Sequence, residues 1–173
     1  MNQEELYTVV GGRGTMTVFE IYIKTTPERL WEAITDGEMR KKYSFGVGTD
    51  SDWKPGSEYK SGVPGVIDIA SGVNLEVDPP RRLVQSFTAL WSEEVEREGE
   101  SRVTWEIEPV GDSCRLSVTH DQLGEQANSE LWGGWPMILS GLKTLLVSVS
   151  VILQCPIILA ISAVSLYIVG MAG

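Results

Sequence analysis

The side chains that could do chemistry in this 173-residue chain are few and far apart. The single histidine, His120, can exchange a proton near neutral pH, but spacing assigns it no acid or base partner. Asp121 follows it directly and would point to the opposite face of a strand. The two cysteines, Cys114 and Cys155, follow no metal-ligand spacing, which argues against a disulfide framework or a zinc site and favours a reducing compartment. We therefore expect no metal and no cofactor.

Motifs of nucleophilic or nucleotide chemistry are also missing from the sequence. There is no G-x-S-x-G turn, and GGRGT at 11–15 lacks the Lys-Ser/Thr pair of a phosphate-binding loop. The net charge of −10 argues against a nucleic-acid partner, because phosphate neutralisation needs clusters of Lys and Arg. Much of the acidic excess lies at 93–100, which we interpret as a solvated hairpin loop, with an interaction surface as the alternative. These features leave enzymatic activity uncertain and favour a binding role.

Alternating apolar residues predict the strands that would position His120 and Cys114. MTVFEIYIK, at 16–24, alternates over a full strand, and SRVTWEIEP and CRLSVTHD repeat the pattern on both sides of a Gly111-Asp112 turn. Two more strands are predicted at 73–77 and 82–91, and Pro55-Gly56 predicts a tight turn between strands. The expected inward residues are Phe19, Ile21, Ile23, Val73, Leu75, Val77, Leu83, Phe87, Ala89, Trp91, Val103, Trp105, Ile107, Cys114, Leu116, Val118 and His120.

Helix signals surround these strands. Thr26 is a suitable N-cap and Pro27 suits the first helical position, so a short helix follows the first strand, and a second is predicted at 37–42. A long helix is predicted near the C-terminus, and consecutive hairpins before it favour an antiparallel sheet with one face covered, an α+β architecture. The apolar stripe of that long helix is expected at Leu131, Trp135, Ile138, Leu142, Leu145 and Val149.

Five segments in this order carry a family resemblance: TTPERLWEAITD, DWKPG, LEVDPPRRLV, VTWEIEPVGDSCRLSVTHD and GWPMILSGLKTLL. Together they resemble the START-like (SRPBCC, Bet v 1-type) superfamily over roughly residues 16–146. Within it, the chain is most similar to the family named after the C-terminal domain of the activator of the 90-kDa heat-shock-protein ATPase. The resemblance implies a helix-grip fold: a curved antiparallel sheet wrapped around a long C-terminal helix, with two short helices after the first strand and a hydrophobic cavity between sheet and helix.

The implied cavity suits an apolar small molecule or lipid held without catalysis, and this is the first functional hypothesis. The second is a co-chaperone-like interaction module with a chaperone partner, as the family name suggests. The third is an enzyme of the cyclase or hydrolase type that uses the same cavity. Each predicted lining residue has a plainer alternative as an ordinary core side chain. The predicted lining is Phe45, Trp53, Phe87, Trp91, Trp105, His120, Trp135 and Leu139.

The two ends of the chain are expected to lie outside this domain. Residues 1–15 would form a flexible lead-in. The tail, 147–173, has no charge and continues the apolar run that begins near the end of the long helix. It is long enough to cross a membrane, which would tether a cytoplasmic domain by its C-terminus. Two alternatives remain open: the tail packs on the domain or on another chain, or it is a disrupted terminus.

Overall fold

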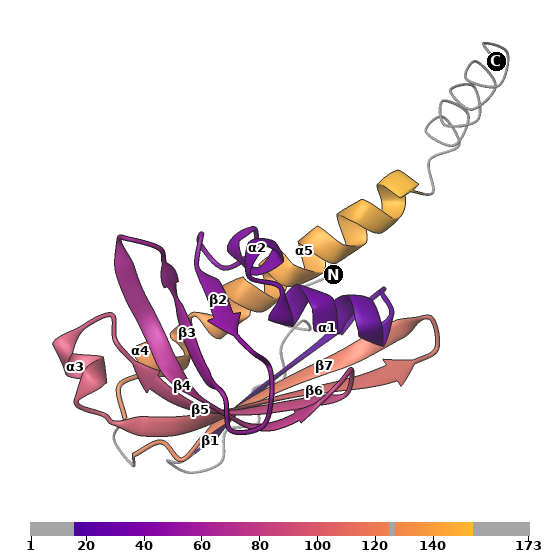
Figure 1. Cartoon of the computed structure of the whole chain (residues 1–173). Helices are drawn as coiled ribbons and strands as arrows, with labels where there is room; N and C mark the ends of the chain where they lie inside the picture. The colour runs from indigo at the N-terminus through magenta and orange to yellow at the C-terminus, as the bar shows by residue number, and fades with distance from the viewer. Residues whose placement is uncertain (1–15, 125–126, 154–173) are drawn as a thin grey trace, which may run out of the picture.

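A computed structural model of the chain describes residues 16–124 and 127–153. It contains one seven-stranded antiparallel sheet, in which the strand order is β1-β7-β6-β5-β4-β3-β2 (Figure 1). The strands are β1 Met16–Ile23, β2 Gly48–Ser51, β3 Glu58–Val63, β4 Ile67–Asp78, β5 Arg82–Ala89, β6 Glu100–Val110 and β7 Ser113–Asp121. The helices are α1 Pro27–Thr35, α2 Gly37–Lys41, α3 Glu93–Glu96, α4 Glu130–Gly133 and α5 Trp135–Leu153.

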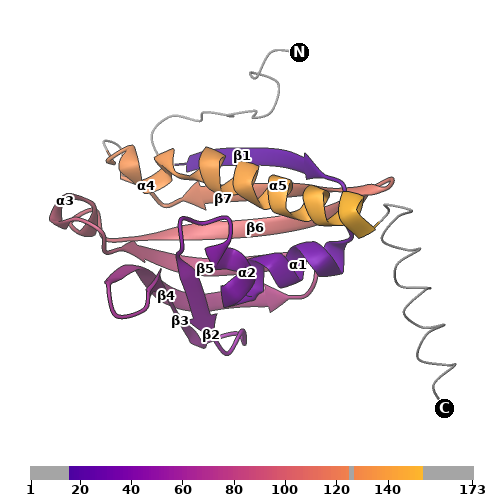
Figure 2. The same cartoon turned by 90° about the horizontal axis from the view of Figure 1, so that it is seen from above.

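The curved sheet packs against three helices on its concave face. α1, α2 and α5 all lie on the concave side, and the strands at the β2 end bend up towards them (Figure 1). Seen from above, α5 runs over β1 and β7, while α1 and α2 lie over the neighbouring strands (Figure 2). The α+β helix-grip fold expected from the sequence is confirmed.

The alternation in three strands predicted the core correctly. Every inward residue expected in β1, β6 and β7 is buried, because each strand has one face against the helices. α1 begins where expected, since the Thr26 side chain accepts a hydrogen bond from the Arg29 N–H at 3.3 Å. Asp36 caps α2 in the same way, accepting from Met39 N–H at 2.7 Å. Local sequence rules therefore suffice for this half of the fold.

The prediction for β4 was right at Val77, which packs against the main core, but wrong at Leu75. Leu75 was expected to point inward, but it is 52% exposed, and its neighbour Asn74 is completely buried. The pairing of β4 with β5 shifts between Asn74 and Glu76, and this bulge exchanges the two faces of the strand. The amide of Asn74 supplies the reason, because it donates to Ser51 Oγ at 2.7 Å and accepts from Gln85 Nε2 at 2.8 Å.

The acidic segment is more ordered than the expected loop. Glu93–Glu96 form the short helix α3, capped by the Ser92 side chain. Its Val95 is fully buried and belongs to a second apolar cluster with Ala89, Leu123 and Leu131. The acidic side chains stay on the surface while this single apolar residue fixes the segment to the sheet.

The long helix buries a stripe that differs slightly from the predicted one. Trp135, Leu139, Leu142 and Leu146 are buried, whereas Ile138 and Leu145 are half-buried. The side chain of Val149, the last residue of the predicted stripe, lies outside the described part of the chain. The difference arises because Leu131 belongs to the separate helix α4, so the periodic pattern restarts at Trp135.

Most of the predicted tail lies outside the described residues, as does the lead-in 1–15. Within the part of the chain that the structure describes, no helix has both the length and the apolar character needed to cross a membrane.

Candidate functional site

A small pocket lies between the sheet and the start of α5. We call it the inner pocket. Its volume is about 20 Å³, roughly the room of one water molecule. It has aromatic walls but several polar groups at its edge. Its lining residues are Arg40, Thr49, Tyr59, Ser61, Gln85, Phe87, Val103, Trp105 and Trp135.

The family resemblance implies a spacious apolar cavity between the sheet and α5. In the described residues, side chains occupy much of this space. Trp105 and Trp135 pack edge to face with ring centres 5.2 Å apart, and Leu139 is completely buried beside them in the main core. Binding pockets for drug-sized molecules usually measure about 300–1,000 Å³, so the inner pocket alone can take only a small group.

The structure brings half of the predicted lining residues together. Trp105, Phe87 and Trp135 border the inner pocket, and His120 contacts the rings of both Phe87 and Trp135. Leu139 belongs to the main core but does not border the pocket. The remaining three do not border the pocket, although the ring centre of Trp91 lies 6.4 Å from that of Phe87.

Those three residues have different surroundings. Trp53 is half-buried against the main core, and Trp91 is half-buried against the second cluster. Phe45 was expected to point inward and does not, because it is 64% exposed in the segment between α2 and β2. Its backbone there has a positive φ of 54°, followed by Gly46 at 80°, and this turn directs the chain into β2.

His120 is the centre of a complete chain of hydrogen bonds. Trp135 Nε1–H donates to His120 Nδ1 at 3.4 Å, so the proton of the neutral ring lies on Nε2. His120 Nε2–H then donates to Ser101 Oγ at 2.8 Å, and Ser101 Oγ–H donates to the Phe87 carbonyl at 3.1 Å. The chain joins α5 to β7, β6 and β5. Because Nε2 carries the proton, His120 has no free lone pair with which to activate the Ser101 hydroxyl.

Burial makes His120 a weak base. The side chain has no exposed surface, and the cost of desolvating an imidazolium lowers its pKa from 6.5 to about 4, against a small opposing effect of Asp121. At neutral pH His120 is therefore uncharged, which is the state that its hydrogen bonds require. No group of three or more His, Cys, Asp or Glu that could hold a metal occurs in the described parts of the chain.

Arg40 brings a charge to the edge of the inner pocket. Its guanidinium carbon lies 5.6 Å from the centre of the Trp105 ring, a cation–π contact. Its Nε is buried without a hydrogen-bond partner among the described residues, and so is Nε1 of Trp105. None of the ion pairs among the described residues includes Arg40. Two residues of the pocket lining thus carry buried N–H donors for which the described part of the chain supplies no acceptor.

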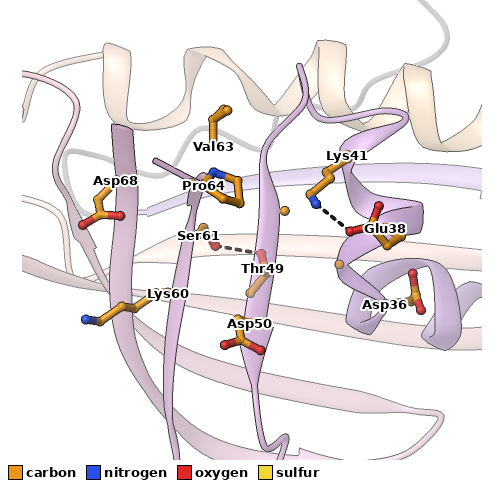
Figure 3. Close-up of a pocket in the computed structure, with 13 residues that line it drawn as sticks. Asp36, Glu38, Lys41, Thr49, Asp50, Lys60, Ser61, Val63, Pro64 and Asp68 are labelled. Atoms are coloured by element: carbon orange, nitrogen blue, oxygen red, sulfur yellow. Dashed lines mark hydrogen bonds and ion pairs between the residues drawn. The ribbon is translucent and has the colours of Figure 1, made fainter. Parts of the chain in front are cut away.

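A larger depression, the outer groove, lies on the side of α2 and the β2–β3 edge (Figure 3). Its volume is about 400 Å³. Lys41 and Glu38 form an ion pair on the α2 wall, and Val63 and Pro64 lie at one end (Figure 3). Its lining residues are Asp36, Gly37, Glu38, Lys41, Gly48, Thr49, Asp50, Lys60, Ser61, Gly62, Val63, Pro64 and Asp68.

The inner pocket and the outer groove meet at Thr49 and Ser61, which line both. These residues are cross-strand partners in β2 and β3, and their hydroxyl groups are hydrogen-bonded at 2.7 Å. This buried pair therefore stands between the groove and the aromatic interior.

The sequence analysis did not predict that polar residues would line the inner pocket and the outer groove. Gln85 could have been found, because it lies two residues from Leu83 and from Phe87 and so shares their inward face. Arg40 gave no such signal. It lies in a five-residue helix with no buried residue of its own, and its position beneath the aromatic core depends on how α2 is attached to β2.

Comparisons with known proteins agree with this architecture. No curated protein matches the chain. Among solved structures, CalU16 from Micromonospora echinospora has 25% sequence identity and a TM-score of 0.61, over 75% of this chain and 73% of CalU16. An HSP90 activator from Plasmodium falciparum has 20% identity and a TM-score of 0.62, over 77% of this chain and 96% of that protein. The latter likeness shows the fold alone.

A family model provides the stronger assignment. The model described as "Activator of Hsp90 ATPase homolog 1-like protein" matches residues 24–147, which include α1, α2 and six of the seven strands, together with most of α5. The resemblance seen in the five sequence segments is thereby confirmed, and the chain belongs to the family of activator of Hsp90 ATPase homolog 1-like proteins within the SRPBCC superfamily.

Proposed function

We propose that this chain is a non-catalytic binding module for a small molecule with an apolar part. The molecule lies in the outer groove and reaches the inner pocket beside Thr49 and Ser61. The observation that carries the proposal is that these two residues line both depressions. A groove of about 400 Å³ lies within the size range of small-molecule sites, whereas the inner pocket alone does not.

The lining of the groove favours an amphipathic ligand over a wholly apolar lipid. Val63 and Pro64 supply apolar surface at one end, while charged groups such as Asp36 and Lys60 border the rest. Thr49 and Ser61 offer hydroxyl groups that a ligand can contact by exchanging their mutual hydrogen bond. A ligand of this kind is held through a few polar contacts and buries its apolar part against the aromatic interior.

Native mass spectrometry of the purified full-length chain tests the proposal directly. We expect a bound small molecule, which solvent extraction would release for identification. The chain should also be stabilised by at least one of four probes: 3-phenylpropanoate, octanoate, and the amides of both. No added mass, and no rise in Tm with any of the four at millimolar concentration, would contradict the proposal.

A matched pair of variants locates the site. Val63→Trp adds bulk to the wall of the groove, and we expect it to weaken binding of the best probe at least tenfold. Val66→Trp makes the same change in the same hairpin, at a position that is 77% exposed and does not line the groove. Equal loss of affinity in both variants would argue against the groove.

A second candidate is a protein-interaction module of the co-chaperone type. It is favoured by exposed apolar side chains, Phe45 at 64% and Val66 at 77%, in segments that leave the same end of β2 and β3. One structural relative is an HSP90 activator. A pull-down with the full-length chain should then recover an Hsp90-type chaperone, and a Phe45→Ser and Val66→Ser double variant should lose it. Retention of the chaperone by that variant would contradict an interface at this surface.

A further inference from the structure

We infer that the ligand of the inner pocket carries a carboxylate, which Arg40 and the indole N–H of Trp105 hold together. The inference rests on the proposed function, since it names the chemical class that the same site accepts. Its starting point is that two residues of the pocket lining each carry a buried N–H donor with no acceptor among the described residues: Nε of Arg40 and Nε1 of Trp105.

Trp105 gives the clearer indication. It is 98% buried in the middle of β6, and its ring forms part of the pocket wall. A buried indole N–H normally has an acceptor, because an unpaired donor loses its hydrogen bond to water without replacement. The neighbouring Trp135 obeys the rule by donating to His120. Trp105 is the exception, and the pocket provides the space for an acceptor from outside the chain.

Arg40 determines the charge of that acceptor. A partly buried guanidinium is normally paired with a carboxylate. On the opposite face of the sheet from Arg40, the side chains of Arg82, Arg102 and Arg115 each have such a pair. Among the described residues, Arg40 forms no ion pair, and its guanidinium lies against the face of Trp105. The ring stabilises a cation weakly, and the buried Nε–H has no acceptor among the same residues. A ligand carboxylate would supply that acceptor through a charge-assisted hydrogen bond.

The size of the inner pocket fits a head group and not a whole ligand. About 20 Å³ admits a group of the size of one water molecule without rearrangement, and the long Arg40 side chain can adjust to admit a second oxygen. The remainder of the molecule would lie in the outer groove, beyond Thr49 and Ser61. This division predicts that the carboxylate governs affinity and that the apolar body adds to it.

Isothermal titration of the full-length chain with acid and amide pairs tests the inference. We expect 3-phenylpropanoate and octanoate to bind about 10- to 100-fold more tightly than their amides, as hydrogen bonds to a charged group imply. Arg40→Met should abolish this preference, and Arg40→Lys should restore part of it because the charge returns without the planar fork.

Arg29→Met is the matched control. Arg29 is also partly buried with an unpartnered Nε, but it lies in α1 and lines neither depression. Its variant should keep the full acid preference. Thermal melts of all three variants would show that each is folded.

An NMR readout distinguishes the inference from the proposed function. In ¹⁵N-tryptophan-labelled protein, the indole N–H signal of Trp105, assigned by its loss in Trp105→Phe, should move downfield with 3-phenylpropanoate. Amides that bind as well as acids, with the Trp105 signal unmoved, would overturn the carboxylate and leave the binding module standing. If no probe binds, both are overturned.

Discussion

Two buried polar clusters lie side by side between the sheet and its helices. Among the described residues, only one of them has an acceptor for each of its hydrogen-bond donors. In the first, Trp135, His120 and Ser101 pass hydrogen bonds from α5 into the sheet until the Phe87 carbonyl ends the chain. In the second, Arg40 and Trp105 meet at the inner pocket with donors that have no acceptor. A complete network adds rigidity, whereas an incomplete one is costly unless something else completes it. The His120 cluster therefore stabilises the fold, whereas the Arg40–Trp105 cluster is a candidate binding site.

The largest expected effect is on the pH dependence of unfolding, through His120 in the complete cluster. Since the pKa of His120 is about 4 in the folded chain and near 6.5 when unfolded, the unfolded state binds more protons between these values. Stability is therefore complete above pH 6.5 and falls as the pH drops towards 4, by roughly 3 kcal/mol from this residue.

Urea titrations at several pH values would measure this effect against a His120→Gln variant, which has no titrating ring. The variant should be less stable than the parent at pH 7, and the difference should shrink as the pH approaches 4. A constant difference across the window would mean that His120 does not link folding to protonation.

The next largest difference is expected when one hydroxyl group is removed from each region and the free energies of unfolding are compared. Ser101→Ala leaves His120 Nε2–H buried without an acceptor and should lower the free energy of unfolding by about 1–3 kcal/mol. Ser61→Ala removes a hydroxyl at the junction of pocket and groove, where water can replace it, and should cost less than about 1 kcal/mol. Equal losses in denaturant titrations would show that both hydroxyls have the same role.

The smallest effect is expected at the incomplete cluster itself. Arg40→Met loses the contact with the Trp105 ring but also removes a partly buried charge that has no counter-ion. These terms oppose each other, so the free energy of unfolding should change by less than about 1 kcal/mol. If a thermal or urea melt showed that the free energy of unfolding falls by several kcal/mol, Arg40 would be a structural residue. It would then play the same kind of role as His120.

The family assignment covers the scaffold, and the two clusters lie within it. Residues 24–147 match the family model, and the helix-grip architecture is shared with solved structures of several bacterial proteins and of an HSP90 activator. A shared fold does not fix a ligand, because function depends on the side chains placed in the site. In the site that we propose for this chain, those side chains are Arg40, Trp105 and the Thr49–Ser61 pair.

Much of the fold could be predicted from the sequence because its signals are local. Period-two alternation identified the buried faces of β1, β6 and β7, and Thr26 with Pro27 marked the start of α1. The same rule failed at β4, where Asn74 replaces Leu75 inside. A bulge that shifts the register depends on partners in β2 and β5, which a reading of β4 alone does not include.

The sequence by itself determined the buried faces of β1, β6 and β7, the start of α1, the long C-terminal helix and, through five ordered segments, the family. It also placed His120, Trp105 and Trp135 inside. Only the tertiary structure decided that His120 is a link in a closed chain and that Arg40 lies against Trp105, 65 positions further along. Periodicity reports on neighbours within one element, whereas these contacts join elements whose relative positions are set by packing of the whole core.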